Sequence, residues 1–407
     1  MSLKKIILLS VILILTGCSL ILKKDTNYME DYYKDGLPIL YIHPKPTSHD
    51  FYTPLVLIYK GREYKAEGKI RGAASAYFPK KSYTIKFEDD DLFFTDEGSE
   101  KKKIVLNSNF DDNSYIRNRL AFYIWDKLDN NFSISTSSKV IYMNGRYHGL
   151  YTMIDYIGED FIMENSTEEA LKDVQSQHDY SLYKNKLKDA DFSSVNNPVG
   201  YEKKLGYPEP GSPGDMNDIK EFISIIQSSE NFNEKFEQFA DSKSYFDWWF
   251  FTSLIKAEDS AGRNSYHFHN LVTDKWYYIP WDFNASFGQN VKTGRIVPSA
   301  GDGLIYRNDI FKKIVNNSFF TEKYIPDYLI LLDTDLSLDS ILAEVDRLFN
   351  EIRLAGKKDE KVWRDIYKKH FNLNDRKDST TMEEEILYIK NWIKEQHALW
   401  YEQFKEF

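Results

Sequence analysis

The periodicity of the apolar residues changes once along this chain of 407 residues, and that change restricts the fold more than any other feature. Between residues 50 and 164 the apolar residues form short alternating runs broken by glycine, as in "VLIYKGREYKAEGKI", which is typical of strands and hairpins. After residue 215 apolar stripes recur at helical spacing, as in "MNDIKEFISIIQS". Runs of strands followed by runs of helices indicate an α+β fold.

Several single segments in both halves predict individual helices and hairpins. "KVIYMNGRYHGLYTMIDYI" consists of two strand-like runs around Asn144 and Gly145, which predicts a hairpin. "FDDNSYIRNRLAFYIWDKL" predicts one helix inside the strand-rich half. "SKSYFDWWFFTSLIKA" is apolar nearly all round and predicts a buried helix, and "NSYHFHNLVTDKWYYIPWDF" then predicts a strand, a turn and a strand. His267 and His269 share one face of that hairpin; we expect ordinary strand histidines, either packed or exposed, although two histidines could contribute to a metal site.

These patterns divide the chain into five parts. The segment 165–215 is polar and ends in "YPEPGSPGD", whose prolines and glycines predict a loop insertion. The predicted parts are a signal peptide (1–17), a tether with a first strand (18–45), a β-rich unit with one helix (46–164), the loop insertion (165–215) and a helical unit with an embedded hairpin (216–407).

The N-terminal segment "MSLKKIILLSVILILTGCSL" has two lysines, an apolar run and a small-residue ending, which is typical of a secretory signal. Its "LTGC" ending resembles the lipobox of bacterial lipoproteins, and Cys18 is the sole cysteine of the chain. We therefore expect a protein that is anchored through lipid on Cys18 to a bacterial membrane, outside the cytoplasm. The alternative is an ordinary signal peptide with an incidental cysteine.

The net charge of the chain restricts the classes of molecule that it can bind. The formal net charge of −10 argues against a nucleic-acid binder, which normally presents a basic face. By complementarity it favours basic segments of a protein substrate. Only 8 histidines are present, which disfavours a metal enzyme with several histidine ligands.

Three polar residues follow the predicted buried helix in an order that suits phosphoryl transfer. Asp259 and Asn264 are spaced D-x-x-x-x-N, and Asp282 follows at the end of the predicted hairpin. Phosphoryl transfer needs a carboxylate that accepts the proton of the attacking hydroxyl, and oxygen ligands that hold a divalent cation against the phosphates. The alternative is that these side chains cap the backbone of a turn.

The β-rich half offers groups for phosphates. In "KIRGAASAYFPKKSYTIKF", Gly72 and the small residues after it allow close approach of the backbone. Lys80 and Lys81 lead into a strand, with Lys81 on its interior face, where a lysine is costly unless it meets an anion. Asp155, and less well Asp112, are candidate acidic partners for these lysines. The alternative places both lysines at the wet end of the strand.

Several dispersed segments together resemble the CotH family of atypical kinases, named for a bacterial spore-coat protein. The matching segments lie between about residues 50 and 405, and they are "RGAASAYFPKKSYTIKF", "LNSNFDDNSYIRNRLAFYI", "VIYMNGRYHGLYTMIDYI", "YFDWWFFTSLIKAEDSAGRNSYHF" and "WYYIPWDFNASFG". The resemblance implies a two-lobed, protein-kinase-like fold. It also implies use of ATP with Mg²⁺ or Mn²⁺ and phosphorylation of Ser or Thr in a protein substrate.

The resemblance also implies roles for single residues. Asp259 would be the catalytic aspartate. The implied metal ligands are Asn264, Asp282 and Asn284, and the implied cofactor-binding residues are Arg71, Gly72, Lys80, Lys81 and Asp155.

Three positions depart from the motifs of that family. Asn284 and Asp155 stand where an aspartate and a glutamate are usual, and Ala257 stands where an asparagine is common. The departures leave open a weak or inactive kinase-like protein that serves as a surface adhesion or assembly module. An unrelated lipoprotein with chance motifs is a further alternative.

Overall fold

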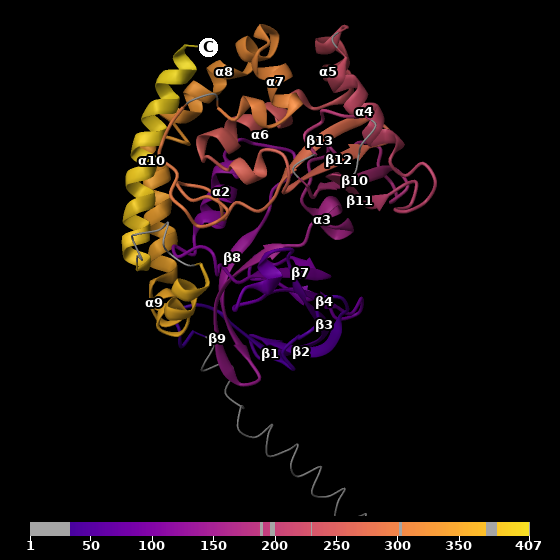
Figure 1. The fold of residues 1–407 in the computed structure, drawn as a ribbon. Coiled ribbons are helices and arrows are strands. Elements are labelled where there is room, and N and C mark those ends of the chain that lie inside the picture. Colours follow the sequence, from indigo (N-terminus) through magenta and orange to yellow (C-terminus); the bar gives the residue numbers. More distant parts are fainter. Residues whose placement is uncertain are drawn as a thin grey trace, which may run out of the picture.

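The computed structural model describes residues 33–187, 190–195, 200–228, 230–300, 303–371 and 381–406. The fold is mixed α+β, as the change in periodicity predicts, with a β-rich part at one end and a mainly helical part at the other (Figure 1). The predicted signal peptide and Cys18 lie outside the described residues, so those two expectations stay predictions. Within the described ranges no helix is both long and apolar enough to span a membrane.

The β-rich part is a closed barrel, which the alternating runs did not predict. Its strands follow the order β1-β2-β3-β4-β7-β9-β8, and β1 closes the barrel by pairing parallel to β8. Closure leaves no exposed sheet edge. The barrel strands are β1 (Ile39–His43), β2 (Thr53–Tyr59), β3 (Arg62–Arg71), β4 (Ser82–Phe87), β7 (Lys103–Asn107), β8 (Thr136–Met143) and β9 (Arg146–Asp155), and a small pair, β5 (Phe93–Phe94) and β6 (Glu100–Lys101), lies beside them.

Local signals inside the barrel half are confirmed. Asn144 and Gly145 join β8 to β9 with φ values of 51° and 74°, the left-handed pair that a tight hairpin turn requires. In β4 the alternate residues Tyr83, Ile85 and Phe87 are buried in the barrel interior. The predicted helix is α2 (Arg117–Asp126), and it packs against β8 and against the long C-terminal helix α9 (Leu338–His370).

The segment predicted as a loop insertion, 165–215, contains two strands, and this corrects the prediction. β10 (Tyr180–Asn185) and β11 (Tyr201–Gly206) join β12 (Ser265–Asn270) and β13 (Lys275–Pro280) in a second sheet of order β11-β10-β12-β13. β11 is an edge strand with partly exposed residues, so its sequence lacks the apolar run of a central strand. β11 pairs with β10, and β10 pairs in turn with β12, which lies about 80 residues further along the chain, a pairing that local patterns do not report.

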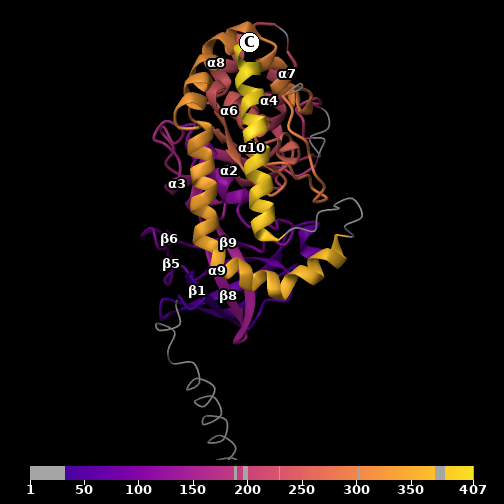
Figure 2. The same ribbon diagram turned by 90° about the vertical axis from the view of Figure 1, so that its left-hand side faces the viewer.

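The helical part surrounds the predicted buried helix, α6 (Ser242–Leu254), which packs against β13, α7, α8 and α10. Helices α9 and α10 lie side by side, and α9 continues from the helical part down to the barrel (Figures 1 and 2). The other helices are α3 (Glu159–Glu164), α4 (Asn217–Gln227), α5 (Phe232–Phe239), α7 (Asp309–Val315), α8 (Ser318–Asp333) and α10 (Met382–Lys405).

The two histidines of the hairpin β12–β13 are both packed. His267 is buried and its ring stacks on Tyr245, and burial lowers its pKa to about 3. His269 lies between two carboxylates, with Nδ1 3.2 Å from Asp218 and Nε2 2.9 Å from Asp274. Burial alone would lower the pKa of His269, but the hydrogen bonds to both carboxylates outweigh it and the net pKa is raised.

His269 should therefore make the stability of the fold depend on pH. Because its folded pKa lies above its unfolded value of about 6.5, its contribution is complete below that pH and is lost as the pH rises through the folded pKa. We expect His269→Gln to flatten the fall in the free energy of unfolding above pH 7, measured by urea titration at several pH values. His267→Gln is the control, because its depressed pKa changes the slope only below about pH 6.5. Equal slopes for His269→Gln and the unmodified protein would contradict the assignment.

Candidate active site

The structure brings Asp259 and Asn264 together. Helix α6 ends at Leu254, a short 3₁₀ turn, Glu258–Ser260, follows it, and Asn264 directly precedes β12. Asn264 Nδ2 donates a hydrogen bond of 2.6 Å to Asp259 Oδ2, while Arg263 pairs with Asp259 Oδ1. The five-residue step therefore closes a small loop around one carboxylate. Asn264 has φ of 55°, a left-handed conformation that asparagine adopts more readily than most residues.

Asp282 lies beside this loop at the end of β13. Ser260 Oγ donates a hydrogen bond of 2.7 Å to the backbone oxygen of Asp282, which ties the two loops together. Burial raises the pKa of Asp282, and the charge of Asp259 raises it further. A carboxylate whose ionisation is opposed by a neighbouring negative charge favours a bound cation.

A further carboxylate, Asp111, completes this region, and the sequence reasoning did not assign it a role in the site. Asn284 Nδ2 donates a hydrogen bond to Asp111 Oδ2. Burial raises the pKa of Asp111 to about 7, with the charge of Asp282 as the second cause. Because Asp111 precedes the predicted helix, it has the pattern of a helix cap, and no local signal places it near residues 282–284.

The donors at this centre suit a hard divalent cation. Mg²⁺ is commonly held by one or two carboxylates and completed by substrate phosphates and water. Asp282 and the side-chain oxygen of Asn264 are such donors. Among the described residues no three His, Cys, Asp or Glu side chains are grouped so that they could hold a metal ion by themselves.

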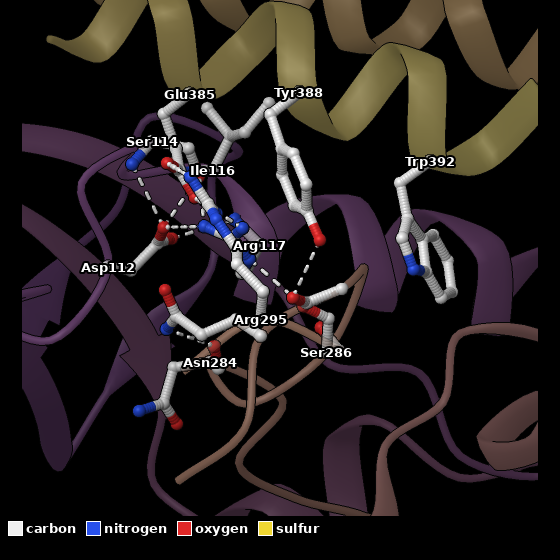
Figure 3. Close-up of polar contacts among 12 residues, drawn as sticks. Asp112, Ser114, Ile116, Arg117, Asn284, Ser286, Arg295, Glu385, Tyr388 and Trp392 are labelled. Carbon is white, nitrogen blue, oxygen red and sulfur yellow. Dashed lines mark hydrogen bonds and ion pairs between the residues drawn. The ribbon is translucent and has the colours of Figure 1, made fainter. Parts of the chain in front are cut away.

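A buried ionic network supports the loop that carries Asp282 and Asn284 (Figure 3). Arg117 of α2 lies 2.6 Å from Asp112 and 2.6 Å from Glu385 of α10, and all three side chains are almost completely buried. Arg117 Nε donates to the backbone oxygen of Ser286 at 3.0 Å. Arg295 also pairs with Glu385 and stacks on a tyrosine of α10. Asp112 was the less favoured of the two acidic partners predicted for Lys80 and Lys81. It pairs with Arg117 in this network instead.

Lys80 does not face the site, which corrects the prediction from the sequence. Its Nζ lies 2.8 Å from Asp359 of α9 and donates to the backbone oxygen of Leu150 at 2.7 Å. Lys80 and Asp359 have side chains that are each only 1% exposed, so phosphate has no access to this ammonium group. The buried lysine that meets an anion is thus Lys80 and not Lys81, which was predicted on the interior face, and the anion comes from a helix about 280 residues away along the chain.

Asp155 is also placed differently from the prediction. It ends β9, lies 3.2 Å from Lys101 and accepts a hydrogen bond from the backbone of Ser135. Its predicted pairing with Lys80 or Lys81 is wrong. Asp155 lines a cavity of about 330 Å³ at the junction between β9 and α3, together with residues of β4, β7 and β11.

The remaining predicted cofactor residues lie around the end of β3. Gly72 has φ of 107°, and a Cβ there would meet Ser75 Oγ at 2.0 Å, so this tight turn requires glycine. Lys81 is half-buried, and its Nζ donates to the backbone oxygen of Ala76 at 2.8 Å, at the far side of the same turn. Arg71 reaches the second sheet, where its guanidinium carbon lies 5.1 Å from the ring centroid of Trp281. Of the predicted cations, Arg71 is the one whose charge acts on Asp282.

A second cavity, of about 340 Å³, opens beside Asp259. Its walls include Glu258, Arg263 and Arg307 from the helical part and residues 285–296 from the loop after β13. Glu258, which also lines the cavity, pairs with Arg307 at 2.5 Å. The cavity leaves Asp259 accessible to a second molecule.

Comparisons with known proteins identify one matching family and two similar proteins. The model of the family described as CotH kinase protein matches residues 69–399. The chain is 23% identical over 304 residues to the inner spore coat protein H of Bacillus subtilis (strain 168), which covers 72% of this chain and 80% of that protein. Among solved structures, the Helicobacter pylori proinflammatory kinase CtkA matches with a TM-score of 0.28 and 12% identity, over 90% of this chain and 95% of that one.

The family match extends over both parts of the fold and includes the Asp259 loop, the hairpin β12–β13 and Asp282. The resemblance noted on dispersed segments is confirmed. The chain belongs to the CotH kinase family.

Proposed function

We propose that this protein is a protein kinase with a two-lobed, kinase-like fold that transfers the γ-phosphoryl group of ATP to Ser or Thr of a protein substrate. The observation that carries the proposal is the contact of Asn264 with Asp259 next to Asp282. These residues supply a proton acceptor and two oxygen ligands in one place, which is the minimal set for this chemistry.

In the proposed reaction Asp259 orients the acceptor hydroxyl and accepts its proton. The hydroxyl oxygen forms a bond to the γ-phosphorus, the bond from that phosphorus to the bridging oxygen breaks, and ADP leaves. Asp282 and Asn264 would hold Mg²⁺ or Mn²⁺, which neutralises charge on the phosphates when bound. The acceptor would approach through the cavity beside Asp259.

Nucleotide binding is the first test of this proposal. A ligand that binds only the native state at about 100 times its Kd stabilises it by about 2.7 kcal/mol. We therefore expect ATP with Mg²⁺ or Mn²⁺ to raise the unfolding temperature by several degrees, whereas ATP in EDTA should raise it less. No shift with any nucleotide and metal would refute the kinase proposal.

An inactive, kinase-like binding module is the second candidate, and one observation favours it. Both oxygens of Asp259 are engaged, by Arg263 and by Asn264, so an acceptor hydroxyl would have to displace a partner. Nucleotide binding without transfer to any Ser- or Thr-containing protein would favour this candidate. Radiolabelled transfer from ATP to a basic test substrate such as histone or protamine would favour the kinase.

We also propose that the protein works at the cell envelope, held to a bacterial membrane by lipid on Cys18. The lipobox-like "LTGC" supports this proposal. Metabolic labelling with a fatty-acid analogue should mark the protein but not Cys18→Ala, and the variant should leave the membrane fraction. Equal labelling of both would refute the lipid anchor.

A further inference from the structure

The side chain of Lys184 is partly buried and lies against two aromatic rings. It belongs to β10, inside the segment predicted as a loop, and its Nζ lies 5.3 Å from the ring centroid of Tyr266 and 6.0 Å from that of Trp281. Within the part of the chain that the structure describes, no hydrogen bond or ion pair joins the side-chain ammonium group of Lys184 to another residue. The pKa of Lys184 is lowered to about 8, with burial as the main cause and the nearby charge of Arg71 as the second.

Arg71 approaches the same place from the barrel. Its guanidinium faces the ring of Trp281, and its buried Nη1 atom has no hydrogen-bond partner among the described residues. A buried donor without a partner costs free energy, and two cations that share a half-buried site repel each other. Arg71 and Lys184 thus present positive charge from opposite sides of the boundary between barrel and second sheet. Asp282, the residue after Trp281, lies close enough to both for its pKa to respond to them.

We propose that Arg71 and Lys184 form a two-cation clamp for the phosphates of a nucleotide, with one cation from each part of the fold. The proposal rests on the proposed function, because the clamp adjoins the same candidate metal ligand, Asp282. Lys80 is held by Asp359, so the positive charge that a kinase needs at the phosphates has to come from other residues. Lys184 is the cation that the sequence reasoning missed.

The chemistry of the clamp defines its ligand class. A guanidinium with an unsatisfied N–H and an ammonium group bind anionic oxygens, and the guanidinium can bind two at once. These two cationic groups recognise anionic oxygens and do not select a particular base or sugar. The ligand is therefore a diphosphate or triphosphate group, and inorganic tripolyphosphate is a sufficient probe.

The test measures binding by isothermal titration calorimetry with the purified full chain. Tripolyphosphate is titrated in EDTA, and ADP is titrated with Mg²⁺. Losing one charge-assisted hydrogen bond weakens binding about tenfold to hundredfold, so Lys184→Met and Arg71→Met should each raise Kd by that factor for both ligands. Lys184→Arg should retain binding. The matched control is Lys186→Met, two residues further along, whose exposed ammonium group pairs with Glu202 and should have no effect on Kd.

Thermal unfolding without ligand separates a binding role from a structural one. The lowered pKa of Lys184 means that folding opposes its charge, so Lys184→Met should unfold at an equal or higher temperature than the unmodified protein while binding phosphate more weakly. A structural lysine would show the reverse, with a lower unfolding temperature and unchanged Kd, and that result would overturn the clamp.

The outcomes also separate the clamp from the proposed function. If ADP binds the unmodified protein and Lys184→Met equally, the clamp is wrong and nucleotide binding stands. If tripolyphosphate binding depends on both cations but no phosphoryl transfer occurs, the clamp is right and the kinase proposal fails. If the unmodified protein binds neither ligand, both are wrong.

Discussion

Asp259→Asn should lower the rate of phosphoryl transfer by about 10³-fold without lowering the stability of the protein. A positioned proton acceptor contributes about 10²- to 10⁴-fold, and the amide cannot accept the proton. Asp282→Asn should lower the rate by at least about 10²-fold, because it removes a carboxylate that faces the developing charge through the metal. Transfer of label from ATP to a protein substrate, with thermal unfolding in parallel, measures both effects.

The controls for this prediction come from the same segment. Glu258→Gln changes the neighbouring carboxylate, which is half-exposed and pairs with Arg307 at the surface. Surface pairs of this kind contribute up to about 1 kcal/mol, so its rate should stay within about fivefold of the unmodified protein. Because burial and Asp259 raise the pKa of Asp282, Asp282→Asn should unfold at the same or a higher temperature. Full transfer by Asp259→Asn would contradict the assigned role.

Arg117→Met should cost about 3 to 5 kcal/mol of unfolding free energy, the largest stability effect that we expect in this chain. Removing one partner of a buried ion pair leaves an uncompensated charge, and here Asp112 and Glu385 both lose their contact with Arg117. Glu385 keeps Arg295, which limits the loss at that carboxylate. Urea unfolding at pH 7 gives the difference in free energy.

An exposed arginine gives the matched comparison. Arg62 of β3 pairs with Asp91, and its side chain is 54% exposed. Arg62→Met should cost less than about 1 kcal/mol. If both arginine variants unfold at the same urea concentration, the buried network does not stabilise the fold as argued.

Much of the fold could be predicted because its elements are encoded locally. The turn at Asn144 and Gly145, the apolar helix before Asp259 and the hairpin before Asp282 each have a signature within a few residues. The closure of the barrel and the strands β10 and β11 could not be predicted in this way. They depend on pairing between segments that are remote in sequence and whose own propensities are weak.

The same distinction applies to the candidate site. Asp259 and Asn264 could be placed together because five residues separate them within one loop. The partner of Lys80 could not, because the choice between Asp155 and Asp359 depends on where α9 crosses the barrel. Lys184 was missed because it lies in a polar segment that resembles a loop, and nothing local distinguishes it from the exposed lysines beside it.

The path of the C-terminal helices has a consequence for the order of folding. The only carboxylate that contacts Lys80 among the described residues is Asp359, and the carboxylate of α10 that holds Arg117 is Glu385. When a ribosome has made the whole barrel sequence, neither counter-ion yet exists. Because contacts of such long sequence separation form late and slowly, the barrel cannot reach its final buried state until nearly all of the chain has been synthesised. A nascent chain would therefore stay incompletely folded for most of its synthesis.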